Sequence, residues 1–367
     1  MGQKTDVFVV GGGPAGLAAA IAARQRGFNV VVADGAEPPI DKACGEGLMP
    51  DTLAVLRNLG VSLNPAEGFA FRGIRFIGEG NQVDGSFPMG QGIGLRRPVL
   101  HQRMIEHAEK VGVTLLWRTC VTGLLSQGVS AGGKVIRARW IIGADGIRSR
   151  VRRWCDLDGS VKARRRFAFR RHYRVKPWTD CVEVYWGRNA QAYVTPVGPE
   201  DLCVVLISRN AAVRSASMAA DFPELAGRLL AAVAGPDEGA VTLTCGFGRV
   251  YRNNVALIGD ASGSVDAITG EGLCLSFRQA TALADALAAG DLRQYQAAHR
   301  RLARRPMLMG RLLLLLDSQA KARHRALRAL AEHPELFARL VSVHVGATSP
   351  GHIAATGALL GWRLVAA

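Results

Sequence analysis

The first glycine-rich segment has the spacing Gly-x-Gly-x-x-Gly, which is typical of backbone contact with phosphate groups. The motif comprises Gly11, Gly13, Pro14, Ala15 and Gly16, directly after a short apolar run. Gly11 permits a tight turn, Gly13 lets the backbone approach a pyrophosphate, and Gly16 lets a helix pack closely on a strand. The alanine-rich stretch 17–26 then predicts a helix whose free N–H groups face the phosphates. The segment therefore predicts a dinucleotide site.

An acidic residue at the end of the second apolar run extends this site. The run Val30–Ala33 is followed directly by Asp34, eighteen residues after Gly16. A carboxylate there can accept hydrogen bonds from both hydroxyls of an adenosine ribose, and it would repel a 2′-phosphate. Strand, turn, helix and acid in this order predict an adenine dinucleotide, but they do not distinguish FAD from NAD.

Two later segments favour FAD. Asp145 lies in a Gly-Ala-Asp-Gly turn and Asp260 in a Gly-Asp turn, each directly after an apolar run. Asp260 can bind a polyol hydroxyl, and the turn from Gly270 to Gly272 leads at Leu273 into a predicted helix. The N-terminus of that helix would stabilise the negative charge of a reduced flavin. A single Asp often only caps such a turn, but two of them behind the glycine motif indicate a flavin site.

These segments, in this order, resemble the FAD-dependent monooxygenase superfamily of the para-hydroxybenzoate hydroxylase type, which includes the geranylgeranyl reductases. The resemblance covers residues 1–50, 95–155 and 250–290. It implies an α/β fold: a Rossmann-like, glutathione-reductase-like FAD-binding domain with an inserted antiparallel-sheet substrate domain and a helical C-terminal segment. We expect FAD-binding parts at 1–72, 95–160 and 250–300, a substrate domain at 73–94 and 161–249, and helices over 301–367.

The resemblance also implies roles for single residues. It assigns the glycine motif to the ADP half of FAD, Asp145 to the cofactor and a pyridine nucleotide, and Asp260 to the ribitol. Arg97 is similar to the arginine with which this superfamily reaches FAD. Val121 stands where a backbone group holds adenine.

Two loops look closer to the geranylgeranyl reductase-like branch than to the hydroxylases. Residues 42–48, with Cys44 and Gly45, resemble that branch's Lys-x-Cys-Gly-Gly-Gly-Leu, and 259–272 lacks the His and Pro of the hydroxylases. Cys44 and Glu46 are the weak candidates for catalysis. A thiol beside a flavin can donate a proton or merely line the ring, and Glu46 can shuttle a proton or pair with an arginine. No histidine pair or metal-ligand spacing is visible, so we expect no metal site.

The substrate-side motif departs from the reductases. Tyr193, Thr195 and Pro196, the expected substrate-facing residues, stand where reductases carry aromatic-x-Trp-x-Phe-Pro, and the halogenase signature Trp-x-Trp-x-Ile-Pro is missing. We expect NADPH or NADH, bound transiently, to reduce FAD. The reduced flavin would then activate oxygen to hydroxylate or epoxidise a hydrophobic aromatic or polyketide-like molecule. The alternative is reduction of C=C bonds in a prenyl or lipid substrate, followed by a halogenase or a non-catalytic FAD-binding protein.

Residues 166–175 alternate between two kinds of side chain. Phe167, Phe169 and Tyr173 fall on one side and basic residues, including Arg170 and His172, on the other, a period of two that predicts a half-buried strand. Further strands are predicted over 182–186, 193–195 and 202–207. We expect the basic side to face water, with a clamp for the phosphates of NADPH as the alternative.

Composition sets the outer bounds. The chain has 367 residues, 49% of them hydrophobic, and a net charge of +16, which attracts anions in general. No nucleic-acid-binding motif accompanies this charge, so we expect no nucleic acid partner. Seven scattered cysteines without a Cys-x-x-Cys pair, and no signal-type start, predict a cytoplasmic protein. The basic helices after 292 keep contact with a membrane surface open, and the sequence leaves the oligomeric state undetermined.

Overall fold

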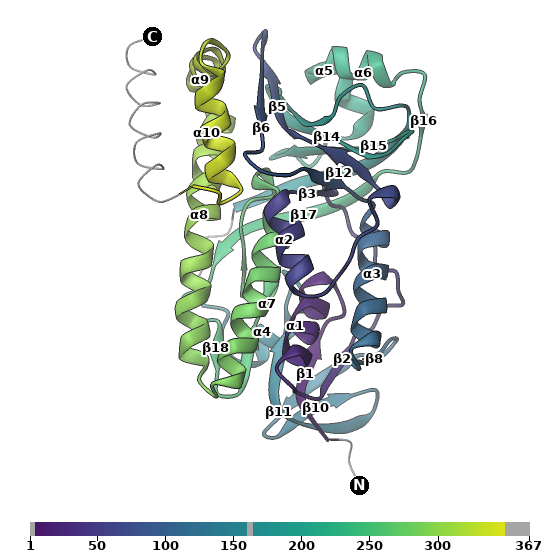
Figure 1. The fold of residues 1–367 in the computed structure, drawn as a ribbon, viewed down its shortest axis with the longest axis vertical. Coiled ribbons are helices and arrows are strands. Elements are labelled where there is room, and N and C mark those ends of the chain that lie inside the picture. The colour runs from purple at the N-terminus through teal and green to yellow at the C-terminus, as the bar shows by residue number, and fades with distance from the viewer. Residues whose placement is uncertain (1–3, 160–163, 349–367) are drawn as a thin grey trace.

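A computed structural model describes residues 4–159 and 164–348 of the chain, and Figure 1 shows two sheets flanked by helices. The first sheet has eight strands in which β1 occupies the centre, and its parallel core has the order β19-β11-β1-β2-β8. These core strands are β1 (Lys4–Val10), β2 (Val30–Ala33), β8 (Thr114–Leu116), β11 (Lys134–Gly143) and β19 (Val255–Leu257). Their largely continuous apolar sequences suit strands that are buried on both faces.

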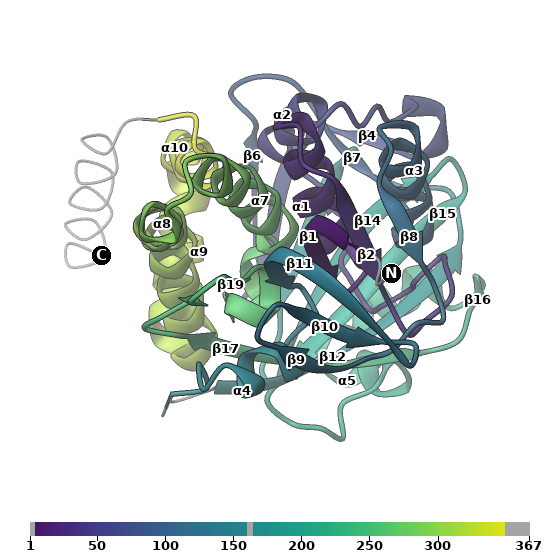
Figure 2. The same cartoon turned by 90° about the horizontal axis from the view of Figure 1, so that it is seen from below.

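Both faces of this sheet are covered (Figure 2). One face packs against α1 (Pro14–Gln25), α3 (Arg97–Lys110) and α7 (Gly272–Ala288). Beyond the other face lie antiparallel strands and a short helix, namely β9 (Val121–Leu125), β10 (Gly128–Ala131) and α4 (Arg150–Trp154); β18 (Tyr251–Arg252) closes one edge. The Rossmann-like part of the prediction is confirmed.

The second sheet has nine strands, and all its pairings are antiparallel except that of β13 with β5. Its strands are β5 (Gly73–Gly78), β6 (Asn81–Ser86), β12 (Arg164–Arg174), β13 (Cys181–Trp186), β14 (Ala190–Gly198), β15 (Asp201–Ser208), β16 (Val233–Ala234), β17 (Glu238–Gly246) and β20 (Gly263–Ser264). Helices α5 (Met218–Asp221) and α6 (Pro223–Leu229) pack on its outer face. The inner face is turned towards the eight-stranded sheet and the C-terminal helices.

The orientation of β12 corrects one expectation. The alternating pattern predicted the strand correctly, but its basic side does not face water: Arg166 and Arg170 are buried, and the His172 side chain is only 15% exposed. The basic side chains can be buried on the inner face because carboxylates from other segments pair with them there. On the outer face, Tyr173 packs against the α5–α6 cluster and Arg214 stacks on Phe169.

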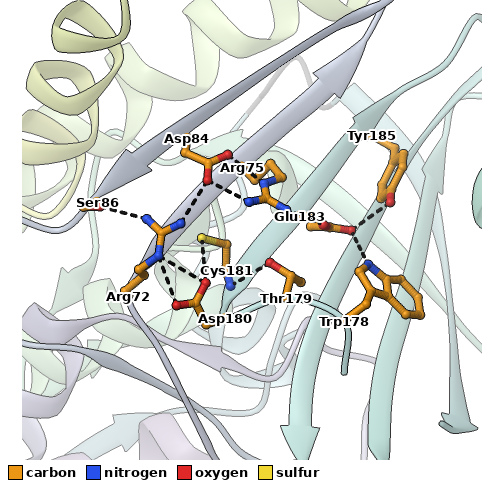
Figure 3. Close-up of polar contacts among 10 residues, drawn as sticks. All are labelled: Arg72, Arg75, Asp84, Ser86, Trp178, Thr179, Asp180, Cys181, Glu183 and Tyr185. Atoms are coloured by element: carbon orange, nitrogen blue, oxygen red, sulfur yellow. Dashed lines mark hydrogen bonds and ion pairs between the residues drawn. The ribbon is translucent and has the colours of Figure 1, made fainter. Parts of the chain in front are cut away.

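A polar cluster ties the parallel edge of this sheet together on its outer face (Figure 3). The buried Glu183 carboxylate accepts hydrogen bonds from Tyr185 at 2.7 Å and from the Trp178 indole at 3.0 Å. Arg75 pairs with both Glu183 and Asp84, which holds the pKa of Asp84 below its usual range. These groups satisfy one another and lie outside the cavity described below, so we interpret the cluster as structural.

The C-terminal helices run along the side of the molecule (Figure 1). They are α8 (Leu292–Ser318), α9 (Ala320–Glu332) and α10 (Pro334–His344). A small sheet of β3 (Gly47–Leu48), β4 (Phe69–Phe71) and β7 (Gly92–Gly94), with α2 (Pro50–Asn58), bridges the two large sheets. Among the described residues, no helix combines the length and apolarity that crossing a bilayer requires.

Candidate functional site

A cavity of about 760 Å³ extends between the two sheets and reaches the C-terminal helices. Its wall contains the turn after β1, the loop around Cys44, the start of α7 and the inner face of the nine-stranded sheet. Every cofactor-contact residue predicted from the sequence lies in this wall except Gly16. Segments far apart in the chain therefore converge on one elongated site.

The phosphate end of the site is the turn between β1 and α1. Gly11 has φ of 109°, and a Cβ there would lie 2.5 Å from the Ala144 carbonyl oxygen. A Cβ on Gly13 would meet nothing within 4 Å, because this position faces the open cavity. Gly16 lies behind the wall, where a Cβ would collide with the Gly11 carbonyl, so it serves helix packing as predicted. Pro14 and Ala15 begin α1 and present its N-terminus to the cavity.

Asp34 marks the adenosine end. Its carboxylate accepts hydrogen bonds from the backbone N–H groups of Gly12 at 2.7 Å and Ala36 at 2.8 Å, which orient it at the cavity wall. Val121 lies nearby in the wall, and so do Thr119 and Cys120, which the sequence analysis missed. Those two residues belong to an irregular segment with no motif that could have identified them.

His101 supports the glycine turn from behind and was also missed. Its Nδ1 accepts a hydrogen bond from the Ile40 N–H at 3.0 Å, so its Nε2 carries the hydrogen and donates to the Gly12 carbonyl at 2.7 Å. Burial lowers the pKa of His101, which favours this neutral form. The ring thus joins the glycine turn to the loop that leads to Cys44.

The middle of the cavity is polar. Asp145 accepts hydrogen bonds from the N–H groups of Arg150 and Val151 through Oδ2, and its buried Oδ1 has no partner in the described chain. Arg97, at the start of α3, likewise has a buried, unpartnered Nε. Asp260 lies 3.3 Å from the Lys42 ammonium. Asp145 therefore caps a helix and still offers an oxygen to a ligand.

The start of α7 forms the next part of the wall. Gly270 has φ of 65° and turns the chain so that the helix begins at Gly272, with Leu273 also at the wall. Glu271 is buried behind them and pairs with Arg305 at 2.9 Å. The free N–H groups of α7 therefore face the cavity, and the neighbouring carboxylate does not.

The two catalytic candidates, Cys44 and Glu46, have different surroundings in the structure. Cys44, Gly45 and Glu46 all belong to the cavity wall. The Glu46 side chain has no exposure at all and points to β12, with φ of 56° at its own backbone. It accepts hydrogen bonds from the Arg97 N–H at 2.9 Å, from Arg170 at 3.2 Å and from His172 Nε2 at 2.7 Å. Of the two roles expected for Glu46, the geometry supports pairing with an arginine. Its carboxylate is directed to β12 and holds the loop in place.

Arg170 completes this cluster; the sequence had placed Arg170 and His172 on a basic strand face without indicating that carboxylates pair with them. Its guanidinium contacts Asp41 at 2.8 Å and Glu238 at 2.5 Å besides Glu46, and its hydrogen bonds lower the pKa of Asp41. Glu46, His172 and Cys203 also form a group close enough to hold a metal ion. We do not interpret it as a metal site, because Arg170 already neutralises the carboxylate and burial raises the pKa of the Cys203 thiol.

The far end of the cavity is apolar. Of the residues expected to face substrate, Tyr193 and Thr195 lie in the cavity wall, whereas Pro196 is buried outside it. The lining side chains come from the sheet (Ile74, Phe76, Val184, Trp186) and from α8–α10 (Leu313, Leu316, Leu330, Phe337). We call this part the apolar channel. Its helical wall was missed because helical spacing alone does not say what a helix packs against.

Comparison with known proteins identifies the family. A protein-family model described as an FAD binding domain matches residues 4–302. The chain belongs to the FAD binding domain family. It is an FAD-dependent oxidoreductase, and the predicted resemblance is confirmed.

Two curated relatives of this flavoprotein are reductases. The menaquinone reductase of Mycobacterium tuberculosis is 29% identical over 330 residues, covering 79% of this chain and 78% of the relative. The digeranylgeranylglycerophospholipid reductase 3 of Methanosphaera stadtmanae is 26% identical over 304 residues, covering 74% of each.

Two solved structures show the same fold as this flavoprotein. A geranylgeranyl bacteriochlorophyll reductase-like protein from Thermoplasma acidophilum gives a TM-score of 0.76 at 19% identity, covering all of this chain and 98% of that one. The p-nitrophenol 4-monooxygenase of Pseudomonas putida gives 0.77 at 18% identity, covering 95% of this chain and 100% of that one. The same fold therefore occurs in a reductase-like protein and in a monooxygenase.

The wall of the flavoprotein's cavity fits FAD. The groups in this wall are Asp34 for a ribose, a glycine turn for phosphates, unpartnered atoms on Arg97 and Asp145, and the N-terminus of α7. Buried polar atoms normally have hydrogen-bond partners, and the hydroxyl and phosphate groups of a dinucleotide would supply them here. Arg97 would hold the phosphates and Asp260 a polyol hydroxyl, while α7 would face the flavin.

Proposed function

We propose that this flavoprotein reduces carbon–carbon double bonds in a long isoprenoid chain of a lipid or quinone. The observation that supports this best is the apolar channel, which continues the cofactor cavity past Tyr193 between the nine-stranded sheet and α8–α10. Its lining is branched aliphatic and aromatic, without a charged side chain among the residues that define it. Such a wall suits a flexible hydrocarbon, which gains binding free energy from burial alone.

The chain's own residues have three tasks in this reaction. The glycine turn, Asp34, Arg97 and Asp260 bind the cofactor. The channel orients the hydrocarbon and excludes water, and the Cys44 thiol, which belongs to the cavity wall and is not engaged by Arg170 as Glu46 is, can carry a proton. Reduced FAD supplies hydride equivalents, and NADPH or NADH is the donor that we infer.

The names of relatives support the same choice. Both curated relatives described above are called reductases, and one is named for a geranylgeranyl-bearing phospholipid. Hydroxylation of a hydrophobic molecule, which sequence reasoning favoured narrowly, is the second candidate because a hydroxylase shares the fold. The small side chain of Thr195, which stands at an aromatic position of the reductase motif, is the specific feature in its favour.

Product analysis separates the two candidates. The FAD-loaded protein is incubated with a geranylgeranyl phospholipid and dithionite without oxygen, and the product mass is measured. We expect a gain of hydrogen atoms in pairs and no gain of oxygen. A product that forms only in air and carries an added oxygen atom would replace the proposal with hydroxylation.

A further inference from the structure

The outward side of α8 exposes a line of apolar side chains. Met307, Leu308, Leu312 and Leu315 are 39%, 46%, 44% and 47% exposed. Positions 308, 312 and 315 follow the three- and four-residue spacing of one helix face, so three of these side chains form a stripe. Large apolar residues on one surface stripe mark a contact with something other than water.

Basic side chains accompany this stripe. Arg301, Arg304 and Arg311 are exposed on the same face of α8, and the adjoining α9 exposes Lys321 and Arg325. Within the described chain, none of these five residues forms an ion pair with a carboxylate. We call the stripe and these five residues the α8–α9 face.

Acidic residues on these helices do not offset the charge. Asp317 is the acid of α8, and it is engaged by Arg166 and Arg209. Glu332 is the acid of α9 and pairs with Arg328. The partner of the α8–α9 face must therefore be negatively charged and must also accept apolar side chains.

The same stripe borders the apolar channel. Leu312 and Leu315 are exposed at the surface and also line the cavity. A hydrophobic molecule that leaves a partner docked on this face would meet the cavity without crossing water. The exposed stripe is therefore continuous with the wall of the apolar channel.

We propose that the α8–α9 face docks on an anionic lipid bilayer. Its leucines would enter the boundary between headgroups and acyl chains, and its basic residues would contact the anionic headgroups. Helices with one apolar and basic side bind bilayers in this way, and the net charge of +16 favours the same surface. Only the purpose of docking, the transfer of an isoprenoid lipid into the channel, rests on the proposed function.

Vesicle sedimentation tests the docking without any substrate. The full chain is mixed with vesicles of phosphatidylglycerol and phosphatidylcholine in equal parts, or of phosphatidylcholine alone. We expect binding to the anionic vesicles that weakens with salt. The triple variant Arg301→Glu, Arg304→Glu, Arg311→Glu should lower the bound-to-free ratio by about tenfold or more, and Leu308→Gln should lower it as well.

A matched variant carries the same charge change on other elements. Arg137→Glu, Arg174→Glu and Arg188→Glu alter three exposed arginines of β11, β12 and the β13–β14 turn, and this variant should bind nearly as well as the parent chain. If both triple variants lost vesicle binding equally, the effect would come from net charge alone, and the proposal would be overturned. It would also be overturned if the parent chain ignored anionic vesicles, or if it were a dimer that the α8 substitutions dissociate. A protein that binds vesicles but reduces no isoprenoid would instead contradict only the proposed function.

Discussion

The carboxylate of Glu46 and the imidazole of His172 lie 2.7 Å apart, although 126 positions separate them in the chain. This contact joins the loop that begins at the cavity-lining Cys44 to the inner face of β12. Arg170 lies on the same carboxylate, and Arg96 approaches it at 3.8 Å. The loop beside the expected flavin position is therefore held by charges from the substrate-side sheet.

Replacing Glu46 by Gln should loosen this loop. The amide keeps the volume but loses the charge that Arg170 and His172 share, so we expect the free energy of unfolding to fall by about 1–3 kcal/mol. Retained FAD should fall with it. Urea denaturation and the flavin absorbance of the purified protein measure the two effects. Glu335→Gln, at an exposed acid paired with His333, is the control, and equal effects in both variants would contradict the role of Glu46.

The glycine turn makes a prediction about two neighbouring glycines. Gly13→Ala should fold normally, because a Cβ there meets nothing within 4 Å, yet it should weaken FAD binding about tenfold or more by occupying the phosphate position. Gly11→Ala should instead destabilise the fold by roughly 1–3 kcal/mol, because its positive φ and the Ala144 carbonyl oppose a side chain.

Flavin titration and thermal unfolding separate these two outcomes. Gly123→Ala is the control, since a Cβ there also meets nothing within 4 Å and the residue lies outside the cavity wall. If Gly13→Ala bound FAD as tightly as Gly123→Ala does, the phosphate position would have been placed wrongly.

The apolar channel predicts a dependence on substrate length. Val184 lies in its wall, so Val184→Phe should narrow the channel and lower the turnover of a geranylgeranyl substrate about tenfold or more. A substrate with a single isoprene unit should be affected much less, and the FAD content should not change. Val184→Ala, which leaves the channel open, is the matched control. Equal losses for long and short substrates would show that the hydrocarbon lies elsewhere.

His299 predicts the pH dependence of stability. Its ring is buried against the Ser262 hydroxyl at 2.9 Å, and burial lowers its pKa to about 4. An unfolded histidine has a pKa of about 6.5. Above that pH both states are neutral; as the pH falls towards 4, the unfolded state binds the proton first. The free energy of unfolding should therefore fall by about 3 kcal/mol over this interval.

Denaturant unfolding at several pH values measures this slope. His299→Gln should flatten the curve between pH 6.5 and 4, because the amide does not titrate. His324→Gln, at an exposed position of α9, should leave the curve unchanged. An unchanged slope in the His299 variant would assign the titration to another group.

The dinucleotide half of the site was predictable because its residues act within a few positions of one another. The turn from Gly11 to Gly16 joins β1 directly to α1, Asp34 directly follows β2, and the turn at Gly270 directly precedes α7, so the geometry of each motif is local. Parallel strands carry their carboxyl ends to one edge of a sheet, so the order of these motifs already implied a common site.

Which face of β12 is buried could not be predicted in the same way. A period of two indicates that a strand has two different faces, but not which of them meets water. The tertiary structure places Asp41, Glu46 and Glu238 against Arg170. Their negative charges offset the desolvation cost of burying the basic side of the strand.

The sequence by itself determined the flavin-binding class of this protein, because the motifs for phosphate, ribose and flavin are short and contiguous. Only the tertiary structure decided what surrounds the flavin position: the clamp between Glu46 and β12, and the apolar channel that α8–α10 complete on the inner face of β5 and β13. Both depend on contacts between segments more than a hundred residues apart. Side-chain types along one segment do not encode such contacts, since any apolar helix face can pack on many surfaces.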